Sequence, residues 1–298
     1  MGMKTKAPTL RQFQDRFPTE ESCLDHLMRV RYGDRHDCQG CGKSAHYYRV
    51  NNRRSYACEY CGYQVYPTAG TPFDRTRTPL RDWFYVMFQF VSSRNGVAAK
   101  EVERQLGVTY KTAWRMCHEI RKYMALVDGS DPLGGLGKTV QIDETFVGGR
   151  RAMGKVKGRQ PFANKTAVFG MLEVGGDIIM QVVPDRRSAT LLPIIRETVK
   201  QASTIHTDEH LPYSGLGMMG FRHQSVNHGR EEYVSRKTGA TVNAIEGFWA
   251  QLKRGINGTH IHVSAKHLPK YLGEFEFRHN RRDRPETMLT ELLVSFQR

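Results

Sequence analysis

The chain has 298 residues, of which 39% are hydrophobic and 25% are charged, a composition typical of a folded protein with a sizeable core. Lysine and arginine total 45 against 30 acidic residues, and the formal net charge of +15 favours a polyanionic partner such as nucleic acid. The first ten residues lack the apolar core of a secretory signal, and the longest apolar stretch, 83–91, covers about half of the ~20 residues that cross a bilayer. We therefore expect a cytoplasmic protein without a membrane partner.

Residues 1–33 are predicted to be a helical lead-in. Apolar residues recur at roughly helical spacing from Phe13 and Phe17 to Leu24 and Leu27. A proline followed by a threonine at 18–19 interrupts this pattern, and that pair is typical of the start of a new helix.

Residues 34–70 contain two copies of the motif Cys-x-x-Cys-Gly, with 16 residues between them. In a reducing compartment such pairs are typical of metal ligands rather than disulfides. Zinc prefers four thiolates in a tetrahedron, and a glycine after each pair can take the positive φ that closes the backbone beneath the metal. The spacing predicts a zinc ribbon with one structural zinc ion, because four protein ligands leave no open coordination position. The predicted ligands are Cys38, Cys41, Cys58 and Cys61, whereas Cys23 and Cys117 are expected to be buried thiols.

Residues 79–126 are predicted to be helical, and 97–124 fit a helix-turn-helix whose turn is at Gly107. Thr109 is a suitable N-cap for the second helix, and Trp114 is expected to pack rather than to contact DNA. One face of that helix is apolar, formed by Ala113, Cys117, Ile120 and Met124. Outside this face lie the residues expected to contact bases and phosphates, Lys111, Thr112 and Arg115. An ordinary helical hairpin would show the same pattern.

Residues 127–138 form the expected linker, because the segment GSDPLGGLG is rich in glycine and has no aromatic residue. The domain expected after it, 139–298, alternates strand-like and helical segments, which predicts a mixed α/β fold. The strand-like segments lie at 138–149, 165–176, 177–185 and 202–210, and the helices at 189–199 and 244–256.

Two aspartates stand on strand-like segments and a glutamate on a later helix. Asp143 lies in TVQIDETFVGG, Asp208 ends STIHTD, and Glu246 lies in AIEGFWAQLKRGI. Carboxylates are rare on buried strands, and clustered carboxylates are what two divalent ions need to bridge a scissile phosphate. The order Asp, Asp, Glu, with 37 residues between the last two, suits an RNase H-like sheet. Strand alternation predicts that Glu144 points to the opposite face from Asp143.

Basic residues are expected to hold DNA near these acids. Lys253 lies two helical turns beyond Glu246 and projects to the same side, and Arg254 follows it. A segment after the first acid-bearing strand carries further basic residues that would bind the DNA backbone, although a solvated loop would look the same: Arg150, Arg151, Lys155, Lys157 and Arg159.

Several stretches make the sequence similar to the ISXO-like insertion-sequence transposases of the DDE superfamily. They are the paired Cys-x-x-Cys-Gly units, IDETFVGG, HTDEHLPY, VNAIEGFWAQLKRGINGTHIHVS and KHLPKYLGEFEFRHNRR, which together cover most of residues 10–282. The resemblance implies a zinc ribbon ahead of an RNase H-like catalytic domain that uses Mg²⁺ or Mn²⁺. It also implies that Asp143, Asp208 and Glu246 are the catalytic acids, with Lys253 as the associated base. Some relatives have Asn or His in place of the third acid, so Asn243 is an alternative third ligand.

The expected function is a DNA transposase that cuts double-stranded DNA at the element ends and joins it to target DNA, without a covalent protein intermediate. We expect it to act as a homodimer or higher oligomer on DNA and to be nucleoid-associated in a prokaryote. Two alternatives stay open. A zinc-ribbon/helix-turn-helix transcriptional regulator would explain residues 1–125 but would give the three acids no role. A metal-dependent nuclease would use the same acids to cut DNA without a joining step.

Overall fold

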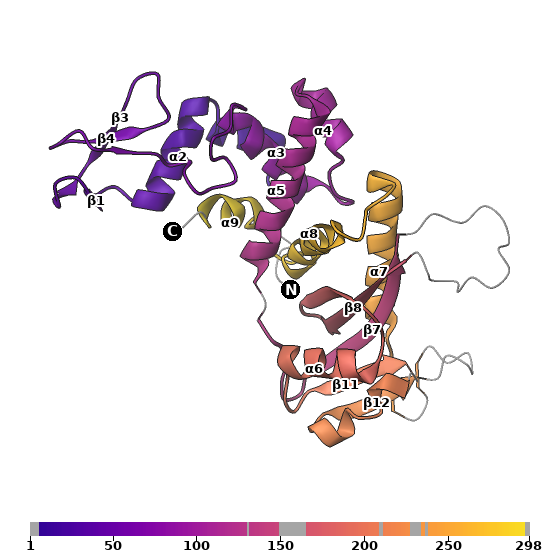
Figure 1. Ribbon diagram of the computed structural model, residues 1–298. Helices are drawn as coiled ribbons and strands as arrows, with labels where there is room; N and C mark the ends of the chain where they lie inside the picture. The colour runs from indigo at the N-terminus through magenta and orange to yellow at the C-terminus, as the bar shows by residue number, and fades with distance from the viewer. Residues whose placement is uncertain are drawn as a thin grey trace. The chain divides into compact units, whose positions relative to one another are not determined.

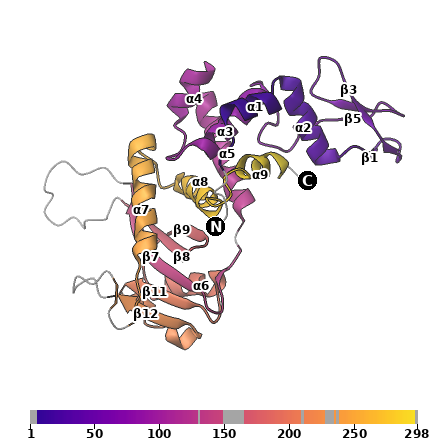
Figure 2. The ribbon, with the colours of Figure 1, turned by 180° about the vertical axis from the view of Figure 1, so that it is seen from behind.

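The computed structural model describes residues 6–129, 131–148, 165–208, 211–226, 234–235 and 238–295 (Figures 1 and 2). The chain forms two compact units, the first comprising Met1–Val127 with Arg281–Arg298 and the second comprising Asp128–Asn280. Among the described residues, no helix is long and apolar enough to cross a membrane.

The first unit begins with two short helices, α1 (Leu10–Arg16) and α2 (Glu20–Tyr32). Each starts after a threonine, Thr9 or Thr19, whose side-chain oxygen accepts a hydrogen bond from the backbone amide three residues later. The apolar residues that predicted these helices are buried, which confirms the helical lead-in and the helix start after residue 18.

Short strands follow α2 and build the cysteine-containing region. One pair of strands is antiparallel, and a second antiparallel sheet has three strands in chain order. The pair is β1 (His36–Asp37) with β2 (Ser44–Ala45), and the sheet is β3 (Tyr47–Arg49), β4 (Tyr56–Cys58) and β5 (Gln64–Val65).

Three helices complete the N-terminal part of this unit: α3 (Leu80–Ser92), α4 (Ala99–Leu106) and α5 (Tyr110–Asp128). α4 ends at Gly107, which adopts the left-handed conformation with φ 66° that a side chain would disfavour. The Thr109 hydroxyl accepts a hydrogen bond from the Thr112 amide at 3.4 Å, as expected of an N-cap. The four apolar residues expected to face the core are fully buried, and α4 and α5 are two helices joined by a short turn, as both the helix-turn-helix and the helical-hairpin interpretations predict.

The end of the chain also belongs to the first unit, whereas the expected catalytic domain ran to residue 298. α9 (Met288–Val294) contacts α2 and α3 through buried leucines. The Arg281 Nε lies 2.5 Å from a Glu291 carboxylate oxygen, and the Leu293 carbonyl lies 3.0 Å from His26 Nε2. α9 packs against the first unit because α2 and α3 cover its apolar face.

A five-stranded mixed sheet forms the second unit, in the order β12-β11-β7-β8-β9. β7, β8 and β9 are successive antiparallel strands, while β11 lies parallel to both β7 and β12. This is the RNase H-like arrangement predicted for the domain. The strands are β7 (Thr139–Val147), β8 (Thr166–Glu173), β9 (Ile178–Val183), β11 (Thr204–Asp208) and β12 (Arg222–Val226).

Helices cover both faces of this sheet. Side chains alternate along each strand, so β7 contributes Val147 to one apolar cluster and Ile142 to another. The first cluster contains residues of α7 (Asn243–Gly255) and α8 (Leu268–Asn280), and Figure 1 shows α7 lying alongside β7. The second contains residues of α6 (Ser188–Thr198), which is helical through Pro193 as predicted.

Part of the expected linker belongs to the second unit. β6 (Leu133–Gly134) pairs with β10 (Val199–Lys200) in parallel. The Gly134 amide donates to a Glu173 carboxylate oxygen at 2.8 Å, and Gly134 has a φ of 81°. A Cβ at Gly134 would lie 2.3 Å from the Ser203 hydroxyl. Glycine at this position therefore lets the backbone approach Ser203 closely, and its role is not to make the segment flexible.

The buried carboxyl of Glu276 on α8 makes the second unit's stability depend on pH. Burial, followed by the nearby charge of Asp128, raises the pKa of Glu276 to about 8. The folded state then binds this proton more tightly than the unfolded state, whose glutamate pKa is about 4.3. The free energy of unfolding should therefore fall as pH rises from about 4 to 8 and then level off.

Glu276→Gln should remove this dependence, because the amide oxygen can still accept from the Met180 amide, which lies 3.2 Å from the carboxylate. We expect the variant to be more stable than wild type by a few kcal/mol, roughly 2–4, at pH 9 and to lose that advantage at pH 4. Urea unfolding of both proteins at the two pH values measures this difference. An equal difference at pH 4 and pH 9 would contradict the assignment.

Candidate active site and metal centre

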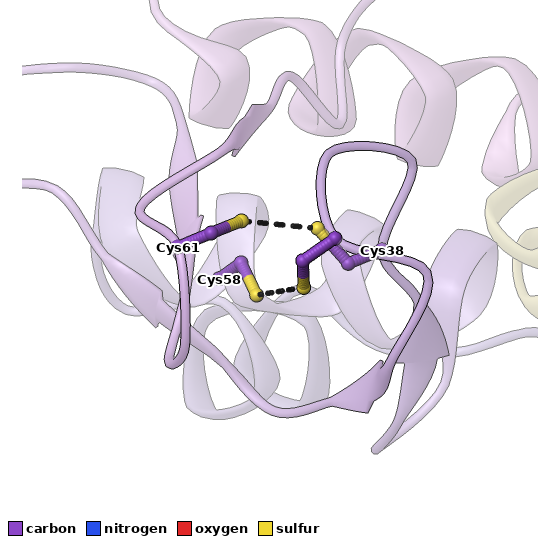
Figure 3. A group of neighbouring side chains, drawn as sticks. Cys38, Cys58 and Cys61 are labelled. Atoms are coloured by element: carbon purple, nitrogen blue, oxygen red, sulfur yellow. Dashed lines mark hydrogen bonds between the residues drawn. The ribbon is translucent and has the colours of Figure 1, made fainter.

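The four predicted cysteines come together between the two short sheets of the first unit. Their sulfur atoms all lie within 4.8 Å of one another. Figure 3 shows the side chains of Cys61 and Cys38 pointing toward each other. The Cys38 and Cys61 sulfurs are 3.5 Å apart, and those of Cys41 and Cys58 are 4.0 Å apart. Sulfur atoms of a tetrahedral zinc site, with Zn–S bonds of about 2.3 Å, would lie about 3.8 Å apart. This donor set fits a structural zinc ion.

Two equivalent turns create that geometry. Each second cysteine is followed by a glycine, Gly42 or Gly62, with φ of 72°. The amide of each glycine donates to the carbonyl of the first cysteine of its pair, at 2.7 Å for Cys38 and 3.0 Å for Cys58. The predicted positive φ is therefore confirmed at both glycines, and each turn directs two sulfurs to the same side.

The exposed side of α5 carries basic and aromatic residues. Lys111 and Arg115 are exposed, and Thr112 is half-buried. Trp114 packs, as expected, through its ring, which stacks on buried His118 with 3.7 Å between ring centroids, but the residue is also 36% exposed. It therefore lies partly at the surface, beside the two exposed cations.

In the second unit, the sheet register brings Asp143 and Asp208 onto adjacent strands. β7 and β11 are parallel, and Gln141 pairs with His206 in the ladder between them. Asp143 and Asp208 each follow two residues later, so continuing this register places them level with each other and on the same face of the sheet. Their proximity has an electrostatic consequence, because the charge of Asp208 raises the pKa of Asp143.

The pKa of Asp143 is raised to about 7, mainly because burial disfavours its charged form, with Glu144 and Asp208 adding to the shift. A hydrogen bond from the Trp249 indole N–H to Asp143 Oδ2, 3.0 Å long, opposes the shift. The site therefore concentrates negative charge in a partly buried place, which favours a bound cation.

Glu144 points to the other face of the sheet, as strand alternation predicts. Its carboxylate accepts a short hydrogen bond from the Tyr213 hydroxyl, and Tyr213 belongs to the apolar cluster beneath α6. Burial, followed by the charge of Glu144, raises the pKa of Tyr213, so the phenol stays protonated and acts as the donor.

The third acid lies on α7, in its first turn. The buried face of this helix is Ile245, Phe248, Trp249 and Leu252, and Glu246, Asn243, Lys253 and Arg254 are exposed. The carboxylates of Glu246, Asp143 and Asp208 do not lie as close together as the four cysteine sulfurs. Within the described residues, the four cysteines form the group of at least three possible ligands that lie close enough together to hold one metal ion.

The predicted basic segment lies outside the described residues, so Arg150, Arg151, Lys155, Lys157 and Arg159 are not placed. Sequence reasoning also missed Gln141 and His206, which hydrogen-bond to the start of α7 and to the segment just before it. Each is a polar residue on a strand, two positions before an acid, and that spacing was the available signal.

Together these features define an RNase H-like protein with an N-terminal zinc ribbon. Residues 132–280 match the family model of the ISXO2-like transposase domain, and residues 18–64 match that of the transposase zinc-ribbon domain. The chain belongs to the ISXO2-like transposase family.

Individual relatives agree with this assignment. An uncharacterized protein in transposable element ISH50 of Halobacterium salinarum is 27% identical over 282 residues, which cover 88% of this chain and 91% of the relative. An uncharacterized transposase-like protein of Haemophilus influenzae is 38% identical over 102 residues, or 33% of this chain and 77% of its own. A crystal structure of a pre-cleavage Mos1 transpososome covers 72% of this chain and 78% of its own at 11% identity; its TM-score of 0.25 is too low to support an argument.

Proposed function

We propose that this protein is a DNA transposase that cuts element-end DNA and joins it to target DNA, with Asp143, Asp208 and Glu246 as its catalytic acids. The observation that carries the proposal is the register of the adjacent parallel strands β7 and β11, in which Gln141 pairs with His206 two residues before Asp143 and Asp208. Membership of the transposase family supports the class of reaction.

The donor chemistry of the site fits Mg²⁺ or Mn²⁺, which prefer carboxylate oxygens. Burial and the charges of Glu144 and Asp208 raise the pKa of Asp143, and a bound cation would offset both effects, which supports the proposal. Two divalent ions, when bound, would stabilise the charge that develops on the attacking and leaving oxygens of a phosphodiester. Asp143 and Asp208 would hold them from the sheet and Glu246 from α7, with Asn243 as the alternative third ligand one turn earlier.

Basic residues near these acids would hold the DNA in place. Lys253 and Arg254 lie in the last turn of α7 and are exposed, so their charges can reach a phosphate. Lys111, Thr112 and Arg115 on α5 would contact the element end. We further propose a homodimer or higher oligomer on DNA, because an element has two ends to be cut and joined.

A strand-transfer assay tests the proposal. The purified protein is incubated with labelled terminal-repeat DNA, a plasmid target and Mg²⁺. Joined products are expected. Cut ends without joining would indicate a nuclease, and DNA that is bound but intact would overturn the enzyme assignment.

DNA binding should protect Trp114 from solvent. The chain has three tryptophans, and Trp83 and Trp249 are only 1% and 4% exposed. Acrylamide should therefore quench the fluorescence of Trp114 selectively, and DNA should reduce that quenching. Trp114→Phe is the control, since it should leave little quenchable signal. Quenching that is unchanged by saturating DNA would exclude α5 as the contact surface.

Salt dependence gives a second check on the same surface. Lys111→Ala and Arg115→Ala should each weaken binding and flatten the log–log salt slope by roughly 0.9, because each removes about one phosphate contact. Lys122→Ala is a matched control, since Lys122 lies on the same helix in an ion pair with Glu119 at 2.9 Å. Slopes that match wild type for both test variants would contradict the prediction.

A further inference from the structure

Strand β7 completes the capping of helix α7. Locally, the Thr241 hydroxyl accepts from the amide of the first helical residue, Asn243, at 3.2 Å. The amides of a helix's first turn have no partner within the helix. The residue at the N-cap position, Val242, offers no side-chain hydrogen bond. Instead, the Gln141 side-chain oxygen accepts from the amides of both Ala244 and Ile245, each at 3.0 Å.

Gln141 is well placed to fix the position of the helix. Gln141 is 1% exposed, and its side-chain oxygen accepts from two amides of the first turn of α7, of which that of Ile245 is buried. The neighbouring residue in the parallel ladder, His206, contacts the segment just before α7, with its Nδ1 3.3 Å from the Thr241 amide. Two adjacent strands therefore hold the start of α7 at the same level of the sheet.

A further hydrogen bond joins the two elements in the same direction, with α7 again the donor and β7 the acceptor. Trp249, one turn after Ile245, donates its indole N–H to Asp143 Oδ2 at 3.0 Å. The residue opposite Asp143 on β8 is Gly170, and a Cβ there would lie 2.5 Å from the Trp249 ring. Because Gly170 has no side chain, the Trp249 ring has the space it needs to reach Asp143.

We propose that Gln141 and Trp249 are positioning residues that hold strand β7 and helix α7 in one arrangement, so that Asp143 and Glu246 bind the same divalent ions. The proposal rests on the proposed function of these acids. Gln141 lies two residues before Asp143 on the strand, and its bonding partner Ile245 lies one residue before Glu246 on the helix. Each acid is therefore only one or two residues from the hydrogen bonds that join the two elements.

Neither residue needs to touch DNA or metal for this role. Side chains that orient metal ligands typically contribute about 10- to 100-fold to metal affinity or activity. Removing the Gln141 acceptor should let α7 shift against β7, and removing the Trp249 donor should let the Asp143 carboxylate rotate.

The test is Mn²⁺ binding to the full-length, zinc-loaded protein, followed by the electron paramagnetic resonance signal of free Mn²⁺, with Mg²⁺-dependent cleavage measured in parallel. Gln141→Leu keeps approximate volume but loses the acceptor, and Trp249→Phe keeps a ring but loses the N–H. Each should raise the Mn²⁺ concentration at half-saturation about 10-fold, and excess metal should restore part of the cleavage rate.

Asn280→Leu is the matched control for a purely structural loss. Asn280 is also an amide side chain that binds backbone, with its Oδ1 2.8 Å from the Ile178 amide on β9. This variant should lose thermal stability, as Gln141→Leu does, but keep the wild-type Mn²⁺ midpoint.

Folded Gln141→Leu protein with the wild-type Mn²⁺ midpoint would overturn the proposal. If Gln141→Leu does not fold, the same measurement is made on Trp249→Phe. Folded Trp249→Phe protein with the wild-type Mn²⁺ midpoint would then overturn the proposal. Failure of the proposed function looks different: Asp143→Asn itself would then leave Mn²⁺ binding and cleavage unchanged.

Discussion

Asp143→Asn and Asp208→Asn should each abolish DNA cleavage while leaving DNA binding intact. Both substitutions keep side-chain size but remove a charge that would hold a divalent ion. Because bound ions supply several kcal/mol of charge stabilisation, we expect a loss of at least about 100-fold in cleavage rate. Binding should be unchanged or stronger, since a negative charge near phosphate is removed.

The same change should not destabilise the fold. Asp143 is partly buried beside Glu144 and Asp208, so its ionised form is disfavoured. Asparagine relieves that repulsion and still offers an oxygen to the Trp249 indole. Thermal unfolding should therefore occur at or above the wild-type temperature, and cleavage and gel-shift assays on the same preparations separate chemistry from binding.

Glu144→Gln is the internal control, because its carboxylate contacts Tyr213 on the opposite face of the sheet. It should cut DNA at a rate much closer to wild type. Lys253→Ala should weaken DNA positioning more than metal binding. If Glu246→Gln cuts normally and Asn243→Ala does not, the third ligand lies one helical turn earlier. Wild-type cleavage by both aspartate variants would refute the enzyme assignment.

Cys58→Ser should release zinc and unfold the zinc ribbon, the segment 34–70. Cys58 is buried and its sulfur lies 4.0 Å from that of Cys41. A structural zinc site and its fold form together, with roughly 10–16 kcal/mol of binding free energy in zinc-finger peptides, so loss of one ligand should have a large effect. Elemental analysis should give one zinc per wild-type chain and much less for the variant.

Cys23→Ala controls for the loss of a buried thiol. Cys23 lies on α2, fully buried, and burial raises the pKa of its thiol to about 12, which disfavours the thiolate that zinc binds. This variant should keep its zinc even if it is less stable. Wild-type protein without zinc, purified in the absence of chelators, would contradict the metal assignment.

Features that depend on neighbours in the sequence could be predicted without a structure. The zinc ligands belong to two short turns, and each Cys-x-x-Cys-Gly unit shows its geometry in its own spacing. The helix-turn-helix is similarly local, since Gly107 and Thr109 mark a helix end and a helix start. The alternation of β7 was sufficient to place Asp143 and Glu144 on opposite faces.

Other features depend on residues far apart in the sequence, and only the tertiary structure decided them. The chain end packs with the first unit because α2 and α3 cover α9, and Trp114 stacks on His118 while remaining 36% exposed. The register that pairs Gln141 with His206 sets Asp143 level with Asp208, and two amides at the start of α7 take their hydrogen-bond acceptor from β7. A sequence pattern shows which face of a strand or helix is apolar, but not which strand lies beside it or at what register. That choice is made by packing and hydrogen bonding across the whole sheet.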